Sequence, residues 1–375
     1  MARLSVVKRF VSFVEGIGKK EMNCHFEIIE PVAEDWQRIA SSPDCTCFHT
    51  EGWFEYLRRI HRKPFVVKIE SEDVAGYFIG AKRWLGINMV ESPAVSTGSY
   101  TTGLCMMRTI SAEERVCIYQ MLYQWLRKKL HVKYMQVSDW QFHTTQNDPI
   151  PPMQWHHPAL DQAKLHYAVR STFYVDTRRS ETELWDNLSY KSCKYSINKA
   201  RKEGLEVRSV DSYGEIPAFV ELHRQQIEDV FSRKGMKPMP YQKKEHLLAL
   251  CQALFPDNVL MLKVMGKDED GVEQCMSTAI FCPGRAASTY FTGASFRQYM
   301  KYCPNELMVW EGMRMLHEKG AGDLIFTGVA HYKKKFGSSY AYLPVLVFTP
   351  YAILFSLRNR LKRFYGNFRN FFKKS

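Results

Sequence analysis

The sequence predicts an α/β (α+β) chain built from two similar units, each a mixed, mainly antiparallel sheet flanked by helices. A length of 375 residues exceeds one ordinary hydrophobic core and suits two domains. Hydrophobic residues make up 45% of the chain and aromatic residues 14%, which argues against disorder. Strand-like alternation and helix-like periodicity follow each other in an order that recurs roughly in both halves.

Four segments are expected along the chain. Lys8 and Arg9 interrupt the first apolar run before it reaches the length of a signal peptide, so a terminal extension is predicted there. The proline-rich stretch 143–160 is the expected crossing between the two units. No run approaches the roughly 18 apolar residues that span a bilayer. The predicted segments are an extension (1–22), a first domain (23–165), a second domain (166–348) and a basic amphipathic tail (349–375).

In the first unit, Thr50 is the expected N-cap of a helix that carries Trp53 into the core. The stretch 91–105 contains two glycines and several hydroxyl side chains, and a pocket-lining loop and a plain surface loop fit it equally. Strands are expected at 25–31, 65–69, 74–81 and 134–137, and helices at 33–40, 50–60 and 112–129.

The stretch 181–207 organises the second unit, because it contains two helix signals and a strand signal. Its first helix is expected at 181–188 and its second from Ser189 or Tyr190 to Gly204, where glycine accepts the left-handed conformation that ends a helix. On the second helix Cys193, Ile197 and Ala200 form an apolar stripe, opposite an arc of Lys191, Lys194, Lys199, Arg201 and Lys202. That arc fits either a solvated face or a phosphate-facing wall.

The rest of the second unit follows a regular order of elements. Helices are expected at 216–231, 243–255 and 305–319. Strands are expected at 171–175, 259–265, 274–281, 286–292, 323–326 and 340–348.

The pattern Leu184-Trp185, followed by Lys194-x-x-Ile197-x-Lys199-Ala200-x-x-x-Gly204, resembles the signature of FemAB-like acyltransferases, including the CelD-type acetyltransferase branch of the GNAT superfamily. The elements after it have the order of a GNAT domain, so the resemblance extends to about residue 348. It implies tandem GNAT-like acyltransferase domains. Those families usually carry arginine at the position of Lys194, so a bidentate contact would become a point-charge contact here.

The segment FTGVAHYKKKFG, residues 326–337, resembles the FemAB-like segment whose lysine lies near the bound substrate. That lysine maps onto Lys333, while Val329 replaces the second glycine of the usual pair. The resemblance implies that Lys333 is catalytic, by stabilising an oxyanion or holding an anionic group. Without the resemblance, the residues favour a solvated basic turn. The implied substrate-binding residues are Lys194, Lys199, Tyr290, Tyr332 and Phe336, although the position of Tyr290 on a buried strand favours a packing role.

No bound cofactor and no metal are expected. The one close cysteine pair, Cys45-x-Cys47, lacks the spacing of a zinc site, and His156-His157 lacks a third ligand. Neither half shows the glycine-rich loop with which typical GNAT enzymes hold coenzyme A. The donor is therefore left open as a co-substrate: acyl-CoA, acyl-ACP or aminoacyl-tRNA. The stretch 204–259 is short for the helical arm of peptidoglycan-bridge enzymes, which favours a thioester.

The formal charge of +13 predicts an anionic partner. Seven of the cations and no acid lie in residues 351–375, where Leu357, Leu361, Phe364 and Phe368 belong to one apolar helical face. Such a helix is expected at an anionic membrane interface, with tRNA binding or packing on the body as alternatives. The scattered cysteines are interpreted as reduced thiols, which predicts a cytoplasmic protein. The tail predicts peripheral contact at the inner face of the plasma membrane.

The functional prediction is an N-acyltransferase that transfers an acyl or aminoacyl group to an amine on a cell-envelope precursor, whether glycan, peptidoglycan or lipid-linked. Its partners would be an anionic donor and the envelope-precursor acceptor. The alternative is a catalytically silent GNAT-like module that binds membrane or RNA. The sequence leaves the oligomeric state open.

Overall fold

The computed structural model describes residues 22–93, 101–146, 154–233, 235–328 and 330–351. The described strands form one 14-stranded sheet. They are β1 (His25–Ile29), β2 (Lys63–Glu70), β3 (Ala75–Trp84), β4 (Asn88–Ser92), β5 (Leu104–Met106), β6 (Tyr134–Ser138), β7 (Thr144–Gln146), β8 (His166–Asp176), β9 (Glu206–Ser209), β10 (Leu260–Lys267), β11 (Glu273–Cys282), β12 (Ala287–Ser295), β13 (Asp323–Phe326) and β14 (Ser339–Phe348).

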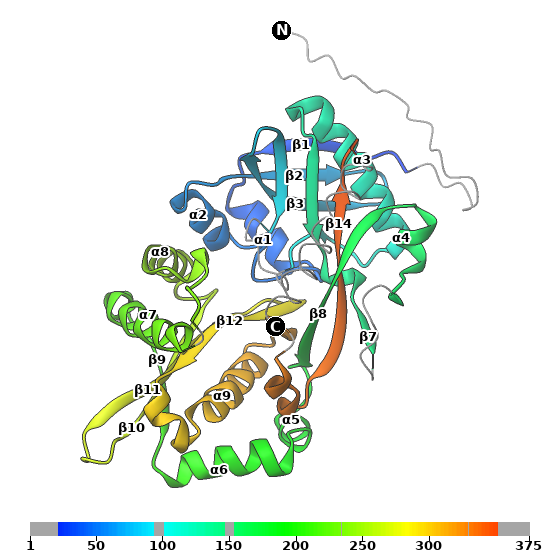
Figure 1. Cartoon of the computed structure of the whole chain (residues 1–375). Helices are drawn as coiled ribbons and strands as arrows, with labels where there is room; N and C mark the ends of the chain where they lie inside the picture. The colour runs from blue at the N-terminus through cyan, green and yellow to red at the C-terminus, as the bar shows by residue number, and fades with distance from the viewer. Residues whose placement is uncertain (1–21, 94–100, 147–153, 234, 329, 352–375) are drawn as a thin grey trace, which may run out of the picture.

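The α-helices flank this sheet (Figure 1). They are α1 (Ala33–Ser41), α2 (Glu51–Arg59), α3 (Ala112–Leu130), α4 (Pro158–Gln162), α5 (Glu181–Asp186), α6 (Tyr195–Lys202), α7 (Ile216–Ser232), α8 (Lys244–Leu254) and α9 (Pro304–Glu318). In the part of the chain that the structure describes, no helix combines the length and the apolar character needed to cross a membrane.

Local capping signals start the helices where the sequence places them. The Thr50 hydroxyl accepts a hydrogen bond of 3.1 Å from the Trp53 N–H, which confirms the predicted cap of α2. Ser111 and Glu114 form a capping box at the start of α3. Trp53 is buried, as expected.

The two halves repeat one order of strands around the centre of the sheet. From one edge to the other the order is β1-β2-β3-β4-β6-β14-β8-β13-β12-β11-β10-β9, with β5 beside β3 and β7 beside β14. Among the described strands, only β4 with β6 and β12 with β13 are parallel. Each parallel pair is connected through a long helix, α3 or α9. This repeat confirms the predicted mixed, mainly antiparallel architecture.

Strands β8 and β14 join the halves (Figure 1). They pair from Ser339↔Tyr174 to Val347↔His166, and β14 also pairs with β6 of the first half. Tyr342, Leu346 and Phe348 fill the first-half core, although β14 is the last strand in sequence. The division at residue 165 stays a prediction, because the sheet continues across it.

A third core lies between the halves, where α2 packs on α7 and α8. Trp53, Tyr56 and Leu57 of α2 share this core with Leu250 and Leu254 of α8. The helices approach so closely that a Cβ at Gly52 would lie 2.5 Å from the Ala253 carbonyl oxygen. Glycine is therefore required at this crossing.

Several predicted boundaries were wrong. The helix expected from Ser189 or Tyr190 to Gly204 is divided into a π-helical turn, η3 (Tyr190–Lys194), and α6. Across this wide turn the Lys194 N–H donates to the Ser189 carbonyl at 3.1 Å, and the Ser189 N–H donates to the Lys335 carbonyl at 2.9 Å. The stripe of Cys193, Ile197 and Ala200 is buried as predicted, and Gly204 has a φ of 73°.

Other errors concern short or long strands. The predicted loop 91–105 contains β5, whose three residues are too few to show a pattern, and the short strand β4 was not predicted. The crossing 143–160 contains β7 and the start of α4, while its residues 147–153 lie outside the described part. Strand β8 begins five residues before the predicted 171 because β14, distant in sequence, pairs with its first half.

We predict that residues 23–165 alone do not fold cooperatively, because β6 loses its β14 neighbour and the core loses three large side chains. Urea denaturation followed by circular dichroism should show no sharp transition. The same segment joined by a flexible linker to residues 339–351 is the control and should regain one. A sharp transition in the unlinked segment would contradict the role given to β14.

Candidate active site

The candidate site lies where β12 and β13 stop pairing. Their parallel pairing runs from Ala287↔Asp323 to Tyr290↔Phe326, where β13 ends, whereas β12 continues to Ser295. The chain then turns at Gly328, with a φ of 84°, into the 3-10 helix η7 (His331–Phe336). This turn sets the side chains of η7 beside the end of β13.

Lys333 is the central charged group of this site. Its side chain is 5% exposed, and its Nζ donates to the Thr327 carbonyl oxygen. Burial lowers the pKa of Lys333 to about 8, because the ammonium loses hydration. Among the described residues, no carboxylate lies within ion-pair distance of it. The site therefore holds a cation without an anionic partner.

Three of the predicted substrate-binding residues surround this lysine. The Phe336 ring stacks on Phe326 at 5.8 Å, and the Tyr290 ring packs on Phe326 at 5.9 Å. The Tyr332 ring centre lies 5.9 Å from Lys333 Nζ. The structure thus brings Lys333, Tyr290, Tyr332 and Phe336 together.

Tyr290 is held deep in the site. Burial, followed by the neighbouring Tyr332, raises its pKa well above the usual value, so its hydroxyl stays protonated. A Cβ at Gly293 would lie 1.8 Å from the Tyr290 hydroxyl oxygen, so only glycine leaves room for this ring.

A second lysine of η7 fixes the site to its surroundings. Lys335 forms an ion pair with Glu306, which lies in the first turn of α9. Cys193 is buried near this pair. Burial raises its pKa to about 12, partly opposed by Lys335, so the thiol stays neutral. Nothing in the local sequence indicates that Lys335 rather than Lys333 would be paired.

Lys194 and Lys199 lie apart from this cluster. Lys194 Nζ is 3.6 Å from an Asp186 carboxylate oxygen and 5.8 Å from the Trp185 ring centre, so it contacts α5 and its end. Lys199 is half-buried on α6. No hydrogen bond, ion pair or ring contact within the described ranges joins either lysine to Lys333. Val329, Leu357, Leu361, Phe364 and Phe368 lie outside the described residues.

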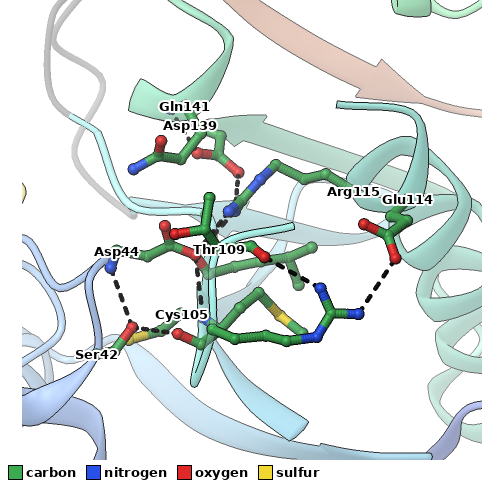
Figure 2. A network of polar contacts seen from close by, with 12 residues as sticks. Ser42, Asp44, Cys105, Thr109, Glu114, Arg115, Asp139 and Gln141 are labelled. Carbon is green, nitrogen blue, oxygen red and sulfur yellow. Dashed lines mark hydrogen bonds and ion pairs between the residues drawn. The ribbon is translucent and has the colours of Figure 1, made fainter. Parts of the chain in front are cut away.

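The corresponding place in the first half is filled by a buried ion cluster (Figure 2). Asp139 follows β6 as residue 327 follows β13, and Arg115 lies near the start of α3 as Glu306 does in α9. Arg115 contacts Asp44 at 2.6 Å and Asp139 at 3.1 Å, and the Tyr119 hydroxyl donates to Asp139 at 2.6 Å. All four side chains are buried. This cluster occupies the position in the first half that the Lys333 site occupies in the second. Sequence reasoning missed it because its members are distant in sequence.

A cavity of about 190 Å³ lies on the opposite face of the sheet. Asp323 accepts hydrogen bonds there from the Trp140 Nε1–H at 2.8 Å and from Arg178 at 2.9 Å. The other residues that line the cavity are His143, Tyr174, Val175, Asp176, Arg179, Gly337 and Ser339. Tyr174 belongs to a different core cluster from its neighbour Phe173, which packs with Phe336 on the Lys333 side. The cavity and the lysine cluster are thus separate features.

The structure supplies no candidate metal centre: within the described residues, no three His, Cys, Asp or Glu side chains gather as ligands. The ten cysteines are free thiols, and the described pair His156 and His157 lies beside α4.

We predict that Arg115→Met lowers the free energy of unfolding by about 3 to 5 kcal/mol, because two buried carboxylates lose their cation. The matched control is Arg108→Met, because the Arg108 side chain is 45% exposed and its partner Glu114 is only partly buried, so its loss should cost no more than about 1 kcal/mol. Urea denaturation measures both. Equal losses would contradict the central role of the buried cluster.

The sequence matches no protein-family model and no curated protein. The solved structure of FemX superposes with a TM-score of 0.63 at 11% identity, covering 88% of this chain and 99% of FemX. A weaker likeness is to L-PGS from Bacillus licheniformis, with a TM-score of 0.42 at 12% identity, covering 73% of this chain and 84% of that chain. Another is to a GCN5-related N-acetyltransferase from Sphaerobacter thermophilus, with a TM-score of 0.36 at 14% identity, covering 86% of this chain and 95% of that chain. The FemX likeness confirms the predicted FemAB-like, GNAT-type fold.

Proposed function

We propose that this chain is an N-acyltransferase of FemAB-like type, which transfers an acyl or aminoacyl group to an amine on a cell-envelope precursor. The observation that carries the proposal is the buried ammonium of Lys333, which has no carboxylate partner among the described residues and lies where β12 and β13 stop pairing. The FemX-like fold supports an acyl-transfer reaction for this cation.

Acyl transfer to an amine develops negative charge on the carbonyl oxygen as the amine attacks. Lys333 would donate to that oxyanion from a site with little water, where such a donor stabilises the transition state strongly. With its pKa at about 8, about nine in ten lysines are protonated at pH 7. Thr327 directs the ammonium through its carbonyl oxygen.

The neighbouring side chains support this role. Tyr332 and Tyr290 retain their protons at neutral pH and would donate one to the leaving group. Phe336 forms part of the apolar wall through its ring contact with Phe326. Lys194 and Lys199 would hold an anionic part of donor or acceptor, and Lys194 would then leave Asp186 for the substrate.

The donor would be acyl-CoA, acyl-ACP or aminoacyl-tRNA as a co-substrate. Between α6 and β10 the α-helices α7 and α8 pack on the body and on each other. This arrangement favours a thioester, because peptidoglycan-bridge enzymes often carry a projecting helical arm here. The excess of cations suits any of these anionic donors. The proposed location is the cytoplasmic face of the plasma membrane, which the basic tail would contact.

A direct assay tests the proposal. The full chain is incubated with each donor and with lipid-linked or nucleotide-linked amino-sugar and peptide acceptors, and mass spectrometry records an added acyl group. Transfer with one pair supports the enzyme. No transfer with any pair, together with retained liposome or RNA binding, would instead support the catalytically silent module.

We predict that Lys333→Met lowers kcat about 100-fold or more, because the oxyanion loses its donor. Lys333→Arg should retain part of the activity and change its pH dependence. The lysine supplies an ammonium below pH about 8 and loses it as the pH rises through 8, whereas arginine stays charged. The wild-type rate should therefore decline above pH 8 and the arginine variant should not. Identical pH profiles would contradict this role of Lys333.

We predict a different effect for Lys194→Ala: a raised KM with kcat nearly unchanged, because Lys194 would bind a remote anionic group. Lys267→Ala, at an exposed lysine that ends β10 away from the basic arc, is the control and should change neither constant. If Lys194→Ala behaves like the control, the basic arc is only a solvated face.

A further inference from the structure

An exposed apolar tip lies between β3 and β4. Trp84 is 68% exposed and Leu85 is 57% exposed, and Ile87 is also exposed across Gly86. The turn is closed by a hydrogen bond of 3.2 Å from the Leu85 N–H to the Ile87 carbonyl. Adjacent large apolar side chains at a protruding turn gain nothing from the fold, so they mark a surface for a partner.

A basic segment is hydrogen-bonded to the base of this tip. Residues 127–133, with the sequence RKKLHVK, form the end of α3 and the start of the next strand. The Lys133 N–H donates to the Asn88 carbonyl at 2.9 Å, and the Asn88 side chain donates to the Leu130 carbonyl at 3.4 Å. Residues 82–90 and 127–135 contain no aspartate or glutamate. The tip thus lies within a cationic surface.

The C-terminal segment leaves the sheet at the same edge. Met89 pairs with Tyr134 at the start of β4, and Met135 pairs with Phe348 at the end of β14. Two strand spacings, about 10 Å, therefore separate the tip from the end of β14. Tyr351, which is exposed, follows there, and the sequence beyond it carries seven cations and no acid.

We propose that this edge, made of the tip 84–87 and the basic segment 127–133, is a docking surface for an anionic lipid bilayer. Trp84 and Leu85 would enter the interface, and Lys129 and Lys133 would contact lipid phosphates. Apolar insertion and cation attraction together give stable peripheral binding where either alone is weak. The surface acts independently of the acyl-transfer chemistry at Lys333.

The experiment is sedimentation of the full chain with vesicles of phosphatidylcholine alone or of phosphatidylcholine with phosphatidylglycerol. Binding should require the anionic lipid and weaken with added salt. The double variant Trp84→Ser with Leu85→Ser should bind about tenfold or more weakly, because two large side chains no longer leave water. Val272→Ser is the matched control, since Val272 is 53% exposed at the acidic β10–β11 turn, and its binding should be unchanged.

Two further measurements separate the causes. Lys129→Glu with Lys133→Glu should abolish the preference for anionic vesicles, and bromine-labelled acyl chains should quench wild-type fluorescence more than that of Trp84→Phe. Thermal unfolding checks that each variant is folded. Unchanged sedimentation of both double variants would overturn the proposal. The proposal would also be overturned if the tip variant kept its vesicle binding but lost a dimer seen by light scattering, or lost RNA binding. The tip would then be assigned to a second copy of the chain or to RNA.

Discussion

The pairing of β8 with β14 is the interaction on which the rest of this structure depends. It joins the two repeats, because β14, the last strand in sequence, completes the sheet of the first half, while β8 pairs with both β14 and β13 of the second. Their side chains enter both main cores, so packing in one half requires the strand supplied by the other. The chain must therefore be nearly complete before either core is full.

The two halves differ in charge pairing at the same position in the fold. In the first half the one buried guanidinium is already paired with two carboxylates, so it is not open to an anionic ligand. In the second half one lysine is paired with Glu306 and the other remains buried without an anion among the described residues. Such a charge is costly unless something else compensates it, and a bound anion or a developing oxyanion is one such group. This difference between the halves places the candidate site in the second half of the described chain.

The sequence predicted the second half better than the first. Strong periodicity placed α7, α8, α9 and the three-strand meander within a few residues, since each buries one continuous face. Strands β4 and β5 were missed because three to five residues carry too short a pattern. The π-helical turn at Tyr190 was not predicted, because the apolar spacing of Cys193, Ile197 and Ala200 fits one continuous α-helix.

The site was predicted only in part, for the same physical reason. The motif at 326–337 led to Lys333 and its aromatic neighbours, whereas charge pattern alone would have made all three lysines of that turn equivalent. Burial and pairing distinguish them, and these depend on contacts with α9 and β13. The grouping of Lys194 with Lys333 rested on the family resemblance, and the structure gives Lys194 a different partner, Asp186. The cluster around Arg115 left no local signal.

Strand β14 also sets a distance. It begins just after η7 and ends beside the hairpin tip, and its ten residues extend about 30 Å. If the tip 84–87 rests on a bilayer, the Lys333 ammonium would lie up to about 30 Å above the lipid headgroups. An amine at the membrane surface would then fall short, whereas one carried several sugar or peptide units out from its lipid anchor would reach the site. The length of β14 would thus set how far the acceptor amine must lie from its lipid anchor.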